Sequence, residues 1–305
     1  MKMDKEYKAF FGIPLDDENP NFYVLGIPWD FSSSYRRGAA KAPSFIRKST
    51  SSKIYNIYSE NLVNLGEFWR LKDLGDLEVS NKTIEQVYND LLRVIEKNYR
   101  DDKFFLFMGG DHIITYLCVK AMKRTIGGEW GLLYFDSHPD LYKEYDGDPY
   151  SHACVVRRIV EEKLVSPENI IEVGIRAPTR EQIDFAKKHD IKIISTHDLY
   201  SLNVKDTLRL LIEELNSRVE KAYLSIDLDV LDPSYAPGVG NPEPGGISTR
   251  QLIDIFHEIS SLNIACFDIV ELCPKYDPSG ISGFAAAKIV REILGIVAKK
   301  KYLSK

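Results

Sequence analysis

The chain has 305 residues, of which 44% are hydrophobic and 28% charged, a composition that excludes a disordered or collagen-like protein. Its net charge of −5 argues against electrostatic binding to nucleic acid. The apolar runs are far shorter than the roughly 20 residues that cross a bilayer, and the polar start of the chain lacks a signal-peptide core. We therefore expect a cytoplasmic protein with reduced cysteines and no nucleic-acid or membrane partner.

Short apolar runs alternate with amphipathic segments along the chain. The predicted strands are 22–27, 104–107, 131–135, 170–174, 192–195, 222–227 and 265–270. Near-continuous apolar runs of this kind are typical of strands that are covered on both faces. Helical stripes of hydrophobic residues are predicted within 84–95, 208–215, 252–259 and 283–299.

This alternation predicts an α/β fold with a mostly parallel sheet of seven or eight strands. An open three-layer sheet and an eight-stranded barrel give the same pattern, so both stay open at this point. No linker, composition break or repeat divides the sequence. We expect a single domain over residues 1–305, in which residues 1–20 form an ordered arm or a flexible tail.

Polar residues that carry chemistry follow four of the predicted strands. In α/β folds, active sites form beyond the carboxyl ends of the strands. The segments found there are Gly109-Gly110-Asp111-His112, Asp136-Ser137-His138-Pro139-Asp140, Asp227-Leu228-Asp229 and Glu271.

The aspartates and histidines of these segments suit a divalent metal. Asp136, His138 and Asp140 alternate, so an extended strand end would turn them to one side. A polar turn with an aspartate capping the next helix is the alternative. Asp227 and Asp229 end a buried strand, where two close like charges are unfavourable without a cation. Helix capping would explain one of them but hardly both.

With His112, the candidate ligands number two imidazoles and four carboxylates. This is too many for one closed zinc site, and no thiolate is among them. The set fits two divalent ions that share bridging carboxylates, and its oxygen-rich character favours Mn²⁺, although affinity alone would favour Zn²⁺ or Cu²⁺. Two adjacent ions lower the pKa of a bridging water and supply hydroxide at neutral pH.

The same motifs, in the same order, resemble the ureohydrolase family of arginase, agmatinase and their relatives. The resemblance extends from about residue 22 to the last helix. The stretches that carry it are Gly109-Gly110-Asp111-His112, Asp136-Ser137-His138-Pro139-Asp140, Ser225-Ile226-Asp227-Leu228-Asp229, Pro244-Gly245-Gly246-Ile247-Ser248 and the early Gly26-Ile27-Pro28-Trp29-Asp30.

The resemblance implies a three-layer α/β/α domain with a parallel eight-stranded sheet, two Mn²⁺ ions and hydrolysis of a guanidinium group to urea. By motif match, one ion would be held by His112, Asp136, Asp140 and Asp229. The other would be held by Asp136, His138, Asp227 and Asp229. Related enzymes form trimers or hexamers, so a homo-oligomer is expected.

The resemblance also assigns roles to two further residues. Glu271 matches the carboxylate that holds the guanidinium, and His152 aligns with the histidine that relays a proton to the leaving amine. We count Asp140 with them as a candidate catalytic residue. The alternatives are an ion-paired Glu271 and a structural His152, because Ala153 stands where glycine more often follows this histidine.

Tyr142 stands where arginase has an asparagine and where agmatinases commonly have tyrosine. We therefore predict hydrolysis of agmatine to putrescine and urea, with N1-aminopropylagmatine, guanidinobutyrate and arginine as alternatives. Nearby acidic residues would favour an ammonium group, whereas guanidinobutyrate would need a cation such as Lys143 or Arg176. The acidic residues are Glu144, Asp146 and Asp148.

Two hypotheses lie outside guanidine hydrolysis. One is a single-zinc amidase or deacetylase on a related fold, against which the six ligand positions argue. The other is a catalytically silent homologue, which the altered loop around His152 favours and the complete ligand set opposes. Two bound metal ions per chain would disfavour both.

Overall fold

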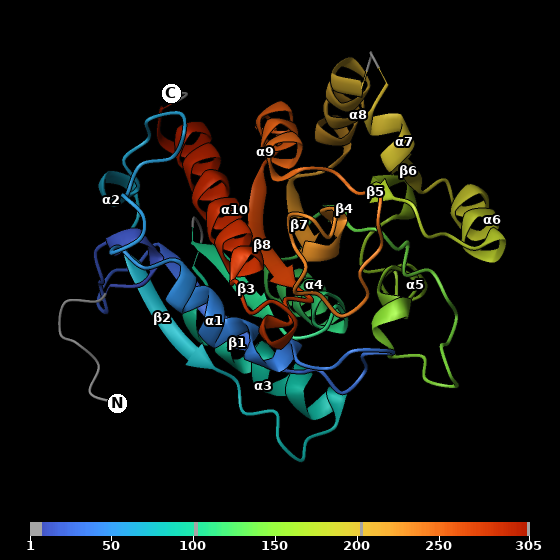
Figure 1. Cartoon of the computed structure of the whole chain (residues 1–305), viewed down its shortest axis with the longest axis horizontal. Helices are drawn as coiled ribbons and strands as arrows, with labels where there is room; N and C mark the ends of the chain where they lie inside the picture. The colour runs from blue at the N-terminus through green and yellow to red at the C-terminus, as the bar shows by residue number, and fades with distance from the viewer. Residues whose placement is uncertain (1–7, 101–102, 202–203, 304–305) are drawn as a thin grey trace.

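The computed structural model describes residues 8–100, 103–201 and 204–303. Eight strands form one sheet in the order β2-β1-β3-β8-β7-β4-β5-β6, and every neighbouring pair is parallel (Figure 1). The strands are β1 (Phe22–Ile27), β2 (Leu71–Asp76), β3 (Phe104–Gly109), β4 (Trp130–Phe135), β5 (Ile170–Ile175), β6 (Lys192–Ser195), β7 (Lys221–Asp227) and β8 (Ile264–Val270). Within the described residues, β2 and β6 stand at the two ends of this order and do not pair with each other, so the sheet is open and the barrel alternative does not apply.

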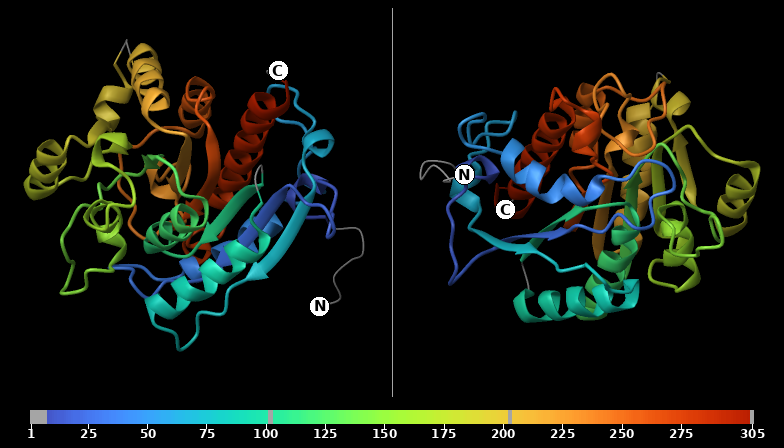
Figure 2. Two further views of the ribbon diagram at one scale, coloured as in Figure 1. Left: turned by 180° about the vertical axis from the view of Figure 1, so that it is seen from behind. Right: turned by 60° about the horizontal axis from the view of Figure 1, so that its bottom comes forward.

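Helices cover both faces of the sheet, which gives three layers (Figure 2). The α-helices are α1 (Ala42–Ser49), α2 (Leu65–Phe68), α3 (Ile84–Asn98), α4 (Ile113–Ile126), α5 (Val155–Glu161), α6 (Arg180–His189), α7 (Thr196–Leu199), α8 (Val204–Arg218), α9 (Thr249–Glu258) and α10 (Ile281–Ala298). Helices α1, α8, α9 and α10 share a hydrophobic core on one face, and α3 to α6 share the core on the other. Successive strand residues supply the two cores alternately, as Phe104 and Phe105 do.

The seven predicted strands and the four predicted helices are all confirmed. Local sequence explains where some helices begin: α3 and α9 each start with a capping box, formed by Thr83 with Gln86 and by Ser248 with Gln251. The pattern missed β2, because this strand is largely exposed and β1 is the one strand that pairs with it among the described residues. It also missed α4, which is buried almost all round and so shows no stripe.

The topology places β3, β8, β7 and β4 side by side in the middle of the sheet. Since all strands are parallel, their carboxyl ends meet at one edge, and every segment with candidate ligands follows one of these four strands. Within the described residues, no helix is long and apolar enough to cross a membrane. Phe10 and Phe11, from the predicted N-terminal arm, are buried in the core, and residues 1–7 lie outside the described residues.

Candidate metal centre

The six predicted ligands meet at the carboxyl edge of the sheet. Five of them are buried, and His138 is partly buried. They are His112 after β3, Asp136, His138 and Asp140 after β4, and Asp227 and Asp229 at the end of β7. The structure thus brings together every ligand that the sequence predicts.

The backbone is specialised where it presents these side chains. A Cβ atom on Gly110 would lie 1.6 Å from the carbonyl oxygen of Trp29, so only glycine lets the chain pass at this point and deliver His112. Asp140 and Glu271 have left-handed backbone angles, with φ of 48° and 61°. Such conformations are costly for residues other than glycine, and they cluster at functional sites.

Two groups of three side chains have the spacing of metal ligands, and both contain Asp136. In the first, Nδ1 of His112 lies 2.9 Å from Oδ2 of Asp136 and 3.1 Å from Oδ2 of Asp227. In the second, Nδ1 of His138 lies 3.4 Å from Oδ1 of Asp136 and 3.1 Å from Oδ2 of Asp229. The carboxylate of Asp136 is therefore placed to bridge two ions.

The grouping differs from the division implied by the family resemblance. Asp227 lies with His112, whereas motif matching places it with His138, and Asp229 lies with His138 alone, whereas motif matching places it with both histidines. Asp140 belongs to neither group, although its Oδ2 is 3.5 Å from Nδ1 of His112. The division of ligands between two ions stays a prediction.

The donor set fits a pair of divalent cations. Oδ2 of Asp136 is buried, and apart from the nearby Nδ1 of His112 it has no polar partner among the described residues. Burial and the nearby Asp136 raise the pKa of Asp140 to about 7, and burial with Asp229 raises the pKa of Asp227 well above its usual range. Burial alone would lower the pKa of His112, but Asp136 and Asp227 outweigh it and raise this pKa. The raised pKa values mean that these side chains hold protons when no metal is bound, and bound cations would displace those protons.

Three residues that the sequence did not single out fix the ring of His112. Its Nε2 lies 2.9 Å from Oγ of Ser225, and that hydroxyl donates to Oδ1 of Asp268 at 2.8 Å. The ring of Tyr134 stacks on the imidazole with centroids 4.4 Å apart. A hydrogen bond at the far nitrogen of a ligating histidine sets its tautomer and orientation, so Nδ1 is left for a metal.

Glu271 lies at the end of β8 and connects His112 with His152. Its Oε1 accepts the backbone N–H of His112 at 2.9 Å and lies 2.8 Å from Nδ1 of His152. The backbone N–H of Ser34 donates to Nε2 of His152 at 3.0 Å, so in the neutral form of this ring Nδ1 carries the proton and donates to Glu271. Oε2 of Glu271 is buried and has no hydrogen-bond partner. This oxygen is available to a cationic ligand.

A pocket of about 210 Å³ opens on these groups. Besides five of the six predicted ligands, Glu271 and His152, it is lined by Ser34, Tyr142, Tyr145, Ala153, Ala177, Gln182 and Asn241. Sequence reasoning singled out Tyr142 for the substrate but assigned no role to Ser34, Tyr145, Gln182 or Asn241.

The charged residues that the sequence offered for the end of the substrate remote from the guanidinium do not line this pocket. Arg176 turns its guanidinium to backbone carbonyl oxygens, including those of Asp229 at 2.7 Å and Glu243 at 2.6 Å. Lys143 and Glu144 are exposed outside the lining, as are Asp146 and Asp148. Among the described residues, histidines supply the only basic side chains of the lining.

A third group with metal-like spacing, Glu60, His257 and Glu292, lies away from this edge. Its carboxylates already have cationic partners: Lys288 lies 2.7 Å from Glu60 and 2.6 Å from Glu292, and Arg250 lies 2.5 Å from Glu60. We interpret this group as an ion-pair network.

Comparisons with known proteins agree with this geometry. The sequence profile described as the Arginase family matches residues 20–295. An agmatinase of Bacillus subtilis is 32% identical over 300 residues, which cover 96% of this chain and 98% of the relative. A solved agmatine ureohydrolase of Thermoplasma volcanium superposes with a TM-score of 0.84 at 32% identity, covering 97% of this chain and 96% of that one. A proclavaminate amidinohydrolase of Streptomyces clavuligerus gives 0.86 at 27% identity, covering 96% and 97%. The chain belongs to the arginase family of metal-dependent ureohydrolases.

Proposed function

We propose that the protein hydrolyses agmatine to putrescine and urea and that it uses two Mn²⁺ ions held by the six ligands of the candidate metal centre. Two ions bound by these residues would supply a hydroxide nucleophile at neutral pH. Relatives named agmatinase or agmatine ureohydrolase support this choice of substrate. Oxygen-rich ligation with two imidazoles supports Mn²⁺ over a softer metal.

Glu271 is the residue best placed to hold the guanidinium. One of its oxygens is fixed by His112 and His152, and the other is buried, unpartnered and in the wall of the pocket. A guanidinium donates hydrogen bonds from a planar fork, and a charge-assisted bond to a buried carboxylate is stronger than a neutral one. The pair would place the guanidinium carbon beside the metal ligands.

His152 is placed to move a proton when the carbon–nitrogen bond breaks. Burial lowers the pKa of this imidazole, but the carboxylate of Glu271 outweighs it and raises the pKa to about 9. The ring is thus an imidazolium at neutral pH, with a proton on each nitrogen, and its Nδ1 proton lies between His152 and Glu271. Transfer of a proton to the departing amine nitrogen would make it a neutral leaving group.

The choice of agmatine as the substrate rests on the residues that line the pocket. No lysine or arginine lines it among the described residues, so a substrate with a terminal carboxylate would find neither of these cations as a partner. The rings of Tyr142 and Tyr145 meet edge to face, with centroids 5.5 Å apart, and offer aromatic faces to an ammonium group. Oδ1 of Asn241 is buried without a partner in the same wall and can accept an N–H from it.

A substrate panel tests the proposal. The protein is loaded with Mn²⁺, freed of excess metal and assayed for urea release from agmatine, N1-aminopropylagmatine, guanidinobutyrate and arginine, with Asp229→Asn as the inactive control. We expect agmatine to give the highest kcat/KM and guanidinobutyrate and arginine to give little urea. Faster release from either carboxylated guanidine would overturn the choice of agmatine. No urea from any substrate with two metals bound would overturn guanidine hydrolysis itself.

A further inference from the structure

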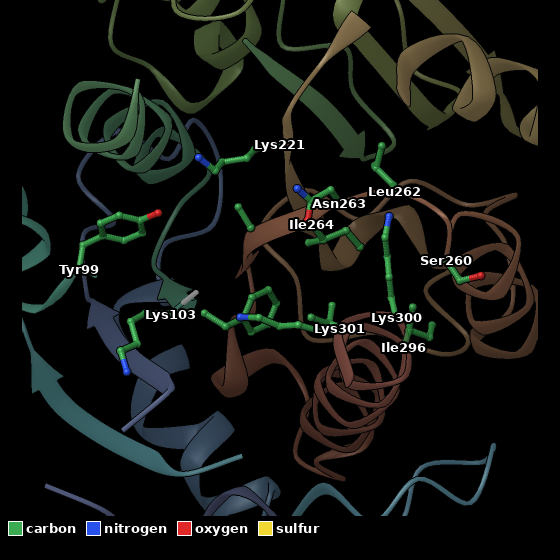
Figure 3. A pocket seen from close by; sticks show the side chains of 13 residues that line it. Tyr99, Lys103, Lys221, Ser260, Leu262, Asn263, Ile264, Ile296, Lys300 and Lys301 are labelled. Atoms are coloured by element: carbon green, nitrogen blue, oxygen red, sulfur yellow. The ribbon is translucent and has the colours of Figure 1, made fainter. Parts of the chain in front are cut away.

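A second pocket lies at the opposite edge of the sheet, under the amino ends of β3, β7 and β8 (Figure 3). Its volume is about 270 Å³. The floor is apolar and includes the buried side chains of Phe104, Leu262 and Ile264. Because all predicted ligands follow the carboxyl ends of strands, this pocket is separate from the candidate metal centre.

The rim of this pocket is basic. It carries Lys103, Lys221, Lys300 and Lys301, and no aspartate or glutamate lines it among the described residues. The charge of this rim is opposite in sign to that of the whole chain, in which 45 acidic residues exceed 40 basic ones. The lysines come from three places in the sequence: the residue before β3, the start of β7, and the π-helical turn η7 (Lys299–Leu303) after α10. In Figure 3, Lys300 and Lys301 reach over the pocket from η7, while Lys221 borders it from another side.

Two of these lysines have no anionic partner within the described parts of the chain. Neither Lys221 nor Lys300 forms a salt bridge there, and the amine of Lys300 donates instead to the backbone carbonyl of Ser261. Burial lowers the pKa of Lys300, so its charge is poorly solvated where it stands. An anion beside this amine would compensate for the lost hydration.

We propose that this lysine-rimmed pocket binds a small organic anion that has a hydrocarbon body. The apolar floor would take the body of the ligand, and Lys221 and Lys300 would bind its charged head. A lone inorganic anion would leave the floor unused, and a neutral hydrocarbon would leave the amines without a partner. The site is distinct from guanidine hydrolysis and does not depend on the proposed substrate.

Equilibrium dialysis of the full-length protein with radiolabelled octanoate tests this proposal. Octan-1-ol and inorganic phosphate serve as probes that each carry only one of the two features. The variants are Lys221→Gln, Lys300→Gln and the pair together, with Lys187→Gln on the exposed surface of α6 as the control of equal charge change. Thermal melting shows which variants are folded, and the single variants decide the test if the double variant is not.

We expect saturable binding of one octanoate per chain. Each single substitution should weaken it several-fold and the pair by roughly tenfold or more, as expected for charge-assisted hydrogen bonds. Lys187→Gln should bind like the wild type, and octan-1-ol and phosphate should bind more weakly than octanoate. Three results would overturn the proposal: no saturable binding up to about 10 mM octanoate, binding unaffected by both lysine substitutions, or equal binding of octan-1-ol.

Discussion

Nδ1 of His152 lies 2.8 Å from Oε1 of Glu271, although the two residues are 119 positions apart in the chain. The same oxygen accepts the backbone N–H of His112, a predicted metal ligand. One carboxylate oxygen of Glu271 is thus fully used within the protein, while the other is buried without a partner. One oxygen holds the side chain of Glu271 in place, and the other is left to bind a substrate.

Replacing Glu271 with glutamine should therefore impair turnover more than folding. The amide keeps one acceptor for His112 but offers the guanidinium no negative charge, so we expect kcat/KM for agmatine to fall roughly 10- to 100-fold. Glu144→Gln, on the exposed loop outside the pocket, should leave it unchanged. Steady-state kinetics on protein of measured metal content provide the check. Equal effects of the two substitutions would refute a substrate-binding role for Glu271.

Asp136→Asn should reduce metal binding more than Asp140→Asn. Asp136 contributes an oxygen to both groups of ligands, whereas Asp140 belongs to neither. We expect the first variant to lose most of both metal ions and the second to keep more of them. Metal content per chain, measured by mass spectrometry after dialysis, distinguishes the two. Retention of two ions by Asp136→Asn would show that this carboxylate does not bridge.

Tyr145 allows the aromatic contribution to substrate binding to be tested separately from its hydroxyl group. Tyr145→Phe keeps the ring and should change KM for agmatine little, whereas Tyr145→Leu should raise KM roughly 2- to 30-fold through loss of the cation–π contact. Since the metal ligands are untouched, kcat should stay close to that of the wild type in both. Identical KM values for the two variants would count against recognition of the ammonium by this ring.

The ligands were predictable from the sequence because each is a polar residue at or within a few positions of the carboxyl end of an apolar strand, as Asp227 and Asp136 are. Parallel strands bring such positions to one edge, and the residues meet there because β3, β7 and β4 lie close together in the strand order of the sheet. Which oxygens group together depends on that order, because β8 lies between β3 and β7 although it is last in the sequence. Linear spacing does not contain this information.

The residues that orient His112 could not be found in the same way. Ser225 and Asp268 lie inside strands whose other residues are mostly apolar. Each is a single polar residue in a hydrophobic segment that is still recognised as a strand. An isolated aspartate in a buried strand is itself a signal, because a buried carboxylate needs hydrogen-bond partners. In the structure, Asp268 accepts from Ser225 and from Tyr223. Its partners come from neighbouring positions that only the fold reveals.

Metal binding should tighten as the pH rises from about 6 to 8. Without metal, burial and Asp136 raise the pKa of Asp140 to about 7, and the pKa values of Asp227 and His112 are also raised. Raised pKa values mean that protons occupy the site at lower pH and must leave when a cation binds, so alkaline conditions favour the metal. Calorimetric titration with Mn²⁺ in two buffers of different ionisation enthalpy counts the released protons. Affinity independent of pH would contradict this coupling.

Ser225→Ala should weaken metal binding without abolishing the chemistry. The substitution removes the hydroxyl that lies 2.9 Å from Nε2 of His112 and thus releases the ring from Asp268. Loss of such a partner behind a ligating histidine typically costs roughly 10- to 100-fold in metal affinity. Excess Mn²⁺ should restore most of the kcat, which a misfolded site would not allow. Ser234→Ala, whose exposed hydroxyl donates to Asp232, is the matched control and should bind Mn²⁺ like the wild type.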